Sequence, residues 1–139
     1  MDLALHHVGI LVRDIAKRAA LYSHRFGYEV RTEIVRDLTQ TAYVQFLKLP
    51  HDRVYLELVS PDGPNSKLTN ALMKGEGLNH LCYSTPSIDE DCARLGSEGL
   101  HLVSAPVQAC AFGARRVAWL MGADGVLIEL VERGAEGEL

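Results

Sequence analysis

Alternating and helical spacings of hydrophobic residues divide the first sixty residues into five elements. Alternation over residues 5–12 predicts a strand. Apolar positions at helical spacing over 15–26 predict a helix, with Asp14 as its N-cap and Gly27 at its C-terminal end. Three further strands are predicted, at 28–35, 41–49 and 54–59. The predicted order is therefore β-α-β-β-β.

The same order returns in the second half of the chain. A strand over 78–84 precedes a helix over 88–95, for which Ser87 is the expected N-cap. The remaining strands are predicted at 100–103, 106–111, 115–121 and 126–132. A turn-rich segment with a short helix at about 66–73 separates the halves. We expect one domain over 1–139, divided into a module of about 4–61, a linker of about 62–77, a module of about 78–132 and a frayed tail at 133–139.

Composition narrows the class of protein. The chain has 139 residues, of which 47% are hydrophobic and 23% charged, as expected for one globular domain. Its net charge of -4 gives no reason to expect nucleic acid or a membrane surface as partner. No apolar run approaches a bilayer span, and no signal-peptide pattern opens the chain. Three widely spaced cysteines indicate a reducing compartment, so we expect a cytoplasmic protein.

Two predicted strands carry a carboxylate among apolar neighbours. Glu129 is flanked by five apolar side chains within residues 126–132, and Glu57 lies between Tyr55 and Val59 on its face of the strand. A buried carboxylate is costly unless it is paired or binds a cation. Both strands are therefore candidates for a metal site.

The spacing of two histidines supports this interpretation. His7 precedes Glu57 by 50 residues, and His80 precedes Glu129 by 49. Each histidine lies in the first predicted strand of its half and each glutamate in the last, so a tandem duplication places the four at equivalent points. Two imidazoles and two carboxylates suit Zn, Co, Ni, Mn or Fe(II) and leave positions open for substrate oxygens.

The chain resembles the vicinal oxygen chelate superfamily, also called the glyoxalase fold, and within it the methylmalonyl-CoA epimerases. The matching segments are residues 5–10, 56–61, 75–81, 112–120 and 125–130. The resemblance implies an α+β fold in which two tandem βαβββ modules pair into an open, cup-like mixed β-sheet. It also implies a divalent metal held by His7, Glu57, His80 and Glu129.

One departure from the epimerase pattern concerns the catalytic base. Some epimerases carry a non-ligating glutamate in the strand before the position of Glu57. Here residues 38–51 contain no acid, and Gln45 is the nearest polar candidate. We therefore expect Glu129 to act as base, helped by Glu57 or Gln45.

The absence of an acid from residues 38–51 argues against two-base epimerisation of a malonyl thioester. Substrate contacts are expected from Arg115, Arg116 and Trp119. Alternation along their strand places Arg115 and Trp119 on one face and Arg116 on the other. An arginine there can pair with a carboxylate or a CoA phosphate.

The expected function is a divalent-metal-dependent isomerase or epimerase that moves a proton through a metal-stabilised enolate. Its substrate is a small molecule with adjacent oxygens, in the favoured case an acyl-CoA such as methylmalonyl-CoA. Three alternatives stay open: a glyoxalase I-type lactoylglutathione lyase, an extradiol-type dioxygenase, and a non-catalytic ligand-binding or resistance protein. Small proteins of this superfamily commonly dimerise, so we expect a homodimer.

Overall fold

The computed structural model describes residues 1–135 and 138–139, and these form two compact units. One unit is His7–Asn79, and the other joins Met1–His6 to His80–Leu139. Strand β1 (Ala4–Leu11) therefore begins in one unit and continues in the other, and β6 (Gly77–Thr85) does the same. Among the described residues, no helix is long and apolar enough to cross a membrane.

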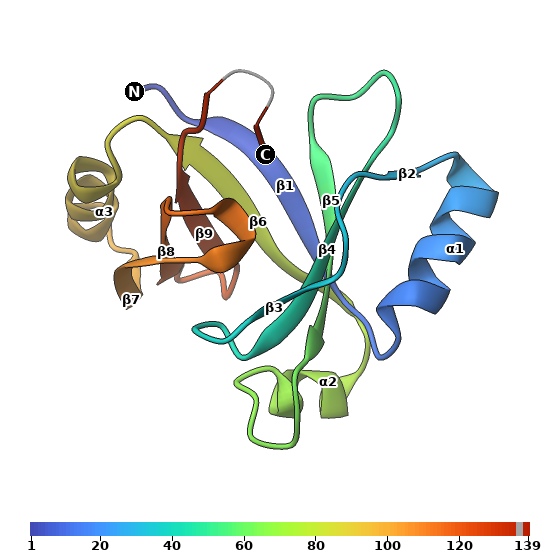
Figure 1. The fold of residues 1–139 in the computed structure, drawn as a ribbon. Helices are drawn as coiled ribbons and strands as arrows, with labels where there is room; N and C mark the ends of the chain where they lie inside the picture. Colours follow the sequence, from blue (N-terminus) through green and yellow to red (C-terminus); the bar gives the residue numbers. More distant parts are fainter. Residues whose placement is uncertain (136–137) are drawn as a thin grey trace. The chain divides into compact units, whose positions relative to one another are not determined.

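The unit His7–Asn79 is a small mixed sheet with a helix on it (Figure 1). Besides the end of β1, its elements are α1 (Ile15–Phe26), β2 (Glu29–Val30), β3 (Val35–Asp37), β4 (Ala42–Lys48), β5 (Tyr55–Pro61) and α2 (Thr69–Lys74). Strand β5 pairs parallel with β1 and antiparallel with β4, and both β2 and β3 pair antiparallel with β4. The central strands β1 and β5 carry the candidate ligands of this unit.

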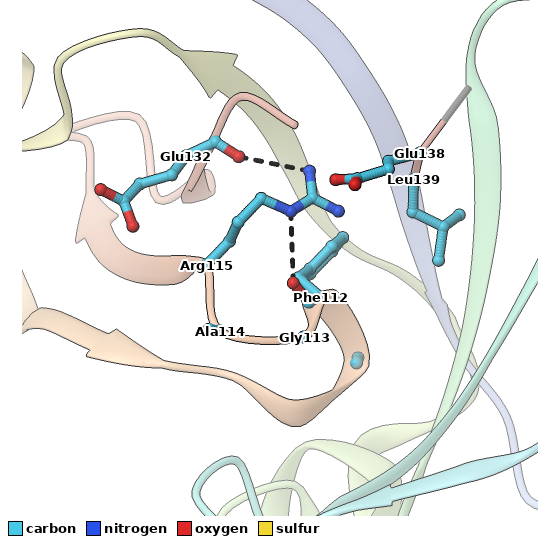
Figure 2. A pocket seen from close by; sticks show the side chains of 8 residues that line it. Phe112, Gly113, Ala114, Arg115, Glu132, Glu138 and Leu139 are labelled. Atoms are coloured by element: carbon cyan, nitrogen blue, oxygen red, sulfur yellow. Dashed lines mark hydrogen bonds between the residues drawn. The ribbon is translucent and has the colours of Figure 1, made fainter. Parts of the chain in front are cut away.

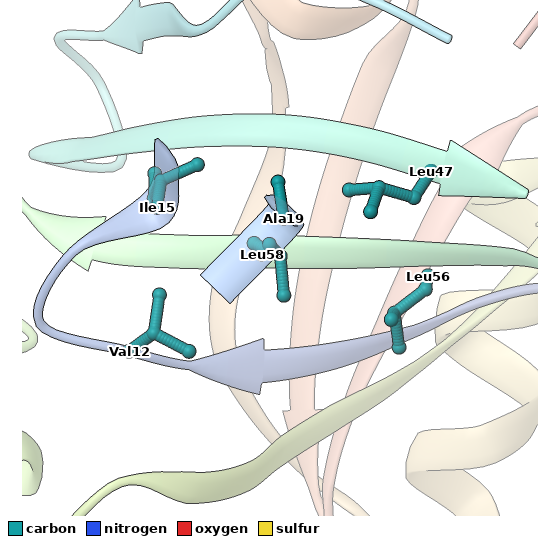
Figure 3. Close-up of a cluster of buried hydrophobic side chains, with 6 residues drawn as sticks. All are labelled: Val12, Ile15, Ala19, Leu47, Leu56 and Leu58. Atoms are coloured by element: carbon teal, nitrogen blue, oxygen red, sulfur yellow. The ribbon is translucent and has the colours of Figure 1, made fainter. Parts of the chain in front are cut away.

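Helix α1 begins and ends at the capping residues that the sequence predicts. The Asp14 side chain accepts a hydrogen bond from the Lys17 amide at 3.0 Å. Gly27 closes the helix in the left-handed region, at a φ of 82°, where glycine has no steric penalty. The helix packs its apolar side on the sheet, and Figure 3 shows the buried cluster made by Val12, Ile15, Ala19, Leu47, Leu56 and Leu58.

The other unit repeats this arrangement. Its elements after β6 are α3 (Ile88–Ser97), β7 (His101–Gln108), the 3-10 turn η1 (Cys110–Phe112), β8 (Arg116–Met121) and β9 (Leu127–Glu132). Strand β9 pairs parallel with β6 and antiparallel with β8, and β7 pairs antiparallel with β8. Helix α3 covers one face of the sheet, where the buried cluster is Ile88, Ala118, Leu120 and Leu130.

The α+β class and the repeated strand–helix–strands order are confirmed. Two predicted boundaries are wrong. The strand expected at 28–35 is two short strands, β2 and β3, which both pair with β4. The strands expected at 100–103 and 106–111 are one strand, β7, followed by a 3-10 turn. Pro106 did not end that strand because β7 is the last strand of its sheet, where a missing amide donor is tolerated.

Two smaller expectations also differ from the structure. The short helix expected at about 66–73 is Thr69–Lys74. Ser87 stands at the N-cap of α3, but its side chain makes no capping hydrogen bond. Instead, the Thr85 hydroxyl accepts from the Ser87 amide and donates to Asp91 in the first turn. The fraying expected for 133–139 stays a prediction, because residues 136–137 lie outside the described part of the chain.

Candidate metal centre

In the unit His7–Asn79, a histidine and a glutamate meet on the face of the sheet away from α1. Strand β1 sends Val8 and Ile10 toward the helix cluster, so the alternate residue His7 points to the opposite face. Glu57 on β5 is placed in the same way between Leu56 and Leu58. His7 Nε2 lies 3.3 Å from Glu57 Oε1, and the two side chains are 0% and 6% exposed.

The other unit contains an equivalent pair. Glu129 on β9 precedes Leu130, which packs under α3, and therefore faces away from that helix. His80 Nε2 lies 3.6 Å from Glu129 Oε1, and these side chains are 2% and 5% exposed. The strand register is also repeated: Glu57 pairs with Gly9, two residues after His7, and Glu129 pairs with Cys82, two residues after His80.

An aromatic ring packs against each histidine. The Phe46 ring contacts His7 edge-on, with centroids 5.2 Å apart, and Phe46 is the cross-strand partner of Glu57. The Trp119 ring contacts His80 edge-on at 4.8 Å, and Trp119 is the cross-strand partner of Glu129. Each unit thus has the same trio of histidine, glutamate and aromatic ring, which holds the imidazole in one orientation.

The residues of each pair fit a metal ion. Both nitrogen–oxygen distances exceed the range of about 2.7–3.2 Å that is usual for an N–H···O hydrogen bond. Two donors that each lie about 2.1 Å from one ion are about 3.0–3.4 Å apart at right or tetrahedral angles. The 3.3 Å distance between His7 and Glu57 falls in this range, and the 3.6 Å distance between His80 and Glu129 lies slightly above it. Buried imidazole and carboxylate together are the donor set of divalent transition metals, and a cation offsets the cost of burying the carboxylate. His7, Glu57, His80 and Glu129 are the residues that could hold such an ion.

Gln45 lies on the other face of its sheet. Its cross-strand partner is Leu58, which belongs to the cluster under α1, whereas Glu57 is the partner of Phe46. The Gln45 amide nitrogen donates to the Thr32 carbonyl oxygen at 3.0 Å. The structure does not bring Gln45 together with Glu57. The geometry gives no support to Gln45 as a base, and that role stays a prediction.

Arg116 belongs to the face of β8 that packs under α3. Its guanidinium contacts Asp89 at 2.9 Å and Glu132 at 3.1 Å. These hydrogen bonds hold the pKa values of both carboxyl groups below their ordinary range and raise the pKa of Arg116. The contacts tie α3 to β8 and β9, so a substrate role for Arg116 stays a prediction that its geometry does not support.

Arg115 lines a pocket of about 540 Å³ in the same unit (Figure 2). Its Nε donates to the Phe112 carbonyl oxygen at 3.2 Å and its Nη1 to the Glu132 carbonyl oxygen at 3.4 Å. The guanidinium also lies over the Phe112 ring, 5.4 Å from its centroid. A Cβ at Gly134 would require this guanidinium to shift. A substrate contact from Arg115 stays a prediction.

Two residues on the candidate metal faces were missed at the level of sequence. Phe46 was not singled out, although it precedes Trp119 by 73 residues, the same spacing that separates His7 from His80. Applying the repeat to every residue near the ligands would have found it. Asp37 is the other, a carboxylate only 2% exposed whose Oδ1 accepts from the Gln40 amide. Asp37 pairs with Ala42, and no sequence pattern marks its burial.

Known proteins resemble this chain over most of its length. The family model described as "Glyoxalase/Bleomycin resistance protein/Dioxygenase superfamily" matches residues 6–132. Human mitochondrial methylmalonyl-CoA epimerase is 32% identical over 91% of this chain and 72% of its own length. Glyoxalase I of Saccharomyces cerevisiae is 25% identical over 98% of this chain and 47% of its own length.

Solved structures give the same picture. The crystal structure of methylmalonyl-CoA epimerase from Mycobacterium tuberculosis is 29% identical, with a TM-score of 0.84 over 95% of this chain and 89% of the other. A Streptomyces coelicolor methylmalonyl-CoA epimerase variant in complex with 2-nitronate-propionyl-CoA is 28% identical, with a TM-score of 0.81 over 94% of this chain and 97% of the other.

Proposed function

This chain belongs to the Glyoxalase/Bleomycin resistance protein/Dioxygenase superfamily, and from that premise we propose that it is a divalent-metal-dependent epimerase or isomerase. The observation that carries the proposal is the repeated pair of buried histidine and glutamate, His7 with Glu57 and His80 with Glu129. We take all four as ligands of a single ion. The ion is Co, Zn, Ni, Mn or Fe(II), since each accepts imidazole and carboxylate donors.

The proposed reaction moves a proton at the carbon next to a carbonyl group. A bound divalent ion supplies Lewis acidity, which makes that C–H more acidic. The Glu129 carboxylate then accepts the proton, because it is buried and lies beside His80 on the candidate metal face. Glu57 is the second carboxylate available to deliver a proton. His7 and His80 keep the two carboxylates in place.

The favoured substrate is an acyl-CoA thioester with a second oxygen next to the reacting carbon. Support comes from the human relative, named methylmalonyl-CoA epimerase, and from the Streptomyces coelicolor structure, whose ligand is 2-nitronate-propionyl-CoA. With a divalent ion held by the four candidate ligands, two such oxygens would be the substrate groups that the ion could bind, and the carbon between them would be the one that loses its proton. A cytoplasmic location and a homodimer stay predictions.

Proton NMR in D2O tests the proposal. The cobalt-loaded protein is mixed with methylmalonyl-CoA, and the C2 proton is followed over time. We expect that proton to exchange for deuterium, and His80→Ala to lose the exchange. If the C2 proton persists while the protein holds its metal, the epimerase proposal is wrong. The apo protein is the matched control, because it retains every side chain.

A glyoxalase I-type lyase is the second candidate, supported by the resemblance to the yeast enzyme. The same NMR assay with methylglyoxal and glutathione distinguishes the two reactions. A lactoyl thioester product without C2 exchange in methylmalonyl-CoA would favour the lyase. Oxygen consumption with a catechol and Fe(II) would instead indicate a dioxygenase, and a purified protein without stoichiometric metal would favour a ligand-binding protein.

A further inference from the structure

Trp119 carries a polar group that its contact with histidine does not require. Its ring packs edge-on against His80 at 4.8 Å. In the other unit, Phe46 makes the same contact with His7 at 5.2 Å, using a ring that has no polar atom. A phenyl ring is therefore sufficient to hold the imidazole. The indole N–H is an addition on the candidate metal face, next to Glu129 on the neighbouring strand.

The indole N–H is buried and lacks an acceptor in the described part of the chain, residues 1–135 and 138–139. Indole nitrogen is a hydrogen-bond donor only, so no other arrangement of its proton can satisfy it. Buried N–H groups are rarely left in this state, because they lose their hydrogen bonds to water without replacement. Where one persists, a functional use is a common reason.

We infer that Trp119 Nε1 donates a hydrogen bond to an oxygen of the substrate bound beside His80 and Glu129. This inference rests on the proposed function and adds a residue that selects the substrate. The partner must be an acceptor, so the substrate presents a carbonyl or carboxylate oxygen to Trp119. An oxygen that gains negative charge as the neighbouring proton leaves accepts this bond more strongly, which favours the reaction as well as binding.

The first test uses the fact that Trp119 is the single tryptophan of the chain. The full-length protein, labelled with 15N, is loaded with diamagnetic zinc and titrated with malonate, a small dianion with paired carboxylates. The one indole cross-peak is followed by NMR while calorimetry measures malonate binding. We expect the indole proton to shift downfield and to saturate together with the calorimetric isotherm.

Two outcomes would overturn the inference in different ways. If zinc and malonate both bind but the indole peak does not move, the inference fails while the metal site stands. If the protein binds no zinc, the proposed function fails and the inference fails with it.

The variant Trp119→Phe is the matched test, because it reproduces the ring that the other unit already uses at Phe46. We expect its zinc affinity to stay within about twofold of wild type, since the ring against His80 is kept. Its malonate Kd should rise by about tenfold or more, as for loss of a hydrogen bond to a charged group. An unchanged malonate Kd in a variant that holds zinc normally would contradict the inference.

Discussion

The two units of this chain have the same topology and the same trio of side chains, but they differ in the residues around the trio. In both units the glutamate pairs with an aromatic residue across the sheet, and that ring contacts the histidine. The ring is Phe46 in one unit and Trp119 in the other. Both units have therefore kept the histidine, the glutamate and the ring contact. They differ in the polarity of the ring.

The faces under the helices differ more. Gln45 lies under α1 with its amide nitrogen bonded to Thr32, whereas Ala118, 73 residues later, is completely buried under α3. Beside the glutamates, Gly9 in one unit is replaced by Cys82 in the other. Residues around the candidate ligands have thus diverged, on the metal faces as well as under the helices, while His7, Glu57, His80 and Glu129 have kept their types and their pairing. This contrast supports the proposal that the four residues form the metal site.

The largest expected effect is on the rate of proton exchange, and it should differ between Glu129 and Glu57. Glu129→Gln should lower the rate of methylmalonyl-CoA C2 exchange by about 10²–10⁴-fold, because it removes the proposed base. Glu57→Gln should lower it less, since an amide oxygen can still bind a metal ion. Metal content of both variants is the control. Equal losses of rate in two variants with equal metal content would show that the glutamates share the proton transfer.

The next effect compares the two cores. Leu58 under α1 and Leu130 under α3 are both fully buried. Replacing either by alanine should lower the free energy of unfolding by about 2–5 kcal/mol, through lost burial and the cavity that remains. Urea unfolding, followed by circular dichroism, measures both. If the units unfold together, each variant shows one transition, and two separate transitions would mean that the units are independently stable.

The smallest effect concerns Arg116, whose contacts have no counterpart among the trio residues. Arg116→Gln should lower stability at neutral pH only slightly, because the contacts are partly exposed. Since Arg116 lowers the pKa values of Asp89 and Glu132, its contribution is present above their ordinary values of 3.8 and 4.5 and is lost as the pH falls below them. The difference between variant and wild type should therefore shrink in acid.

Thermal unfolding at several pH values checks this expectation. Arg31→Gln is the control, because Arg31 approaches Glu29 only to 3.9 Å at an exposed edge. A difference between Arg116→Gln and wild type that grows toward pH 3 would contradict the stated cause.

Much of this arrangement was predictable from sequence, because it follows from local patterns. Alternation located β1, β5, β6 and β9, and the caps Asp14 and Gly27 bounded α1. The spacing of His7, Glu57, His80 and Glu129 indicated the pairs that the structure brings together within each unit.

The remaining features depend on contacts between strands, which local patterns do not encode. The face of the sheet on which Gln45 lies follows from its cross-strand partner, Leu58. That pairing is known only from the register of β4 and β5. The salt bridges of Arg116 depend on where α3 lies. The sequence predicted a break between two strands at Pro106. Proline is tolerated in an edge strand, and only the order of strands in the sheet shows that β7 is one.

The central proposal is that His7, Glu57, His80 and Glu129 are ligands of one ion. Metal content per chain, measured by mass spectrometry after dialysis against a limiting concentration of cobalt, tests it most directly in wild type, His7→Ala and His80→Ala. The account predicts one ion per chain in wild type and a loss of affinity greater than about 100-fold in either variant, since each removes a ligand from the same ion. Two ions per wild-type chain, or full occupancy in either variant, would contradict it.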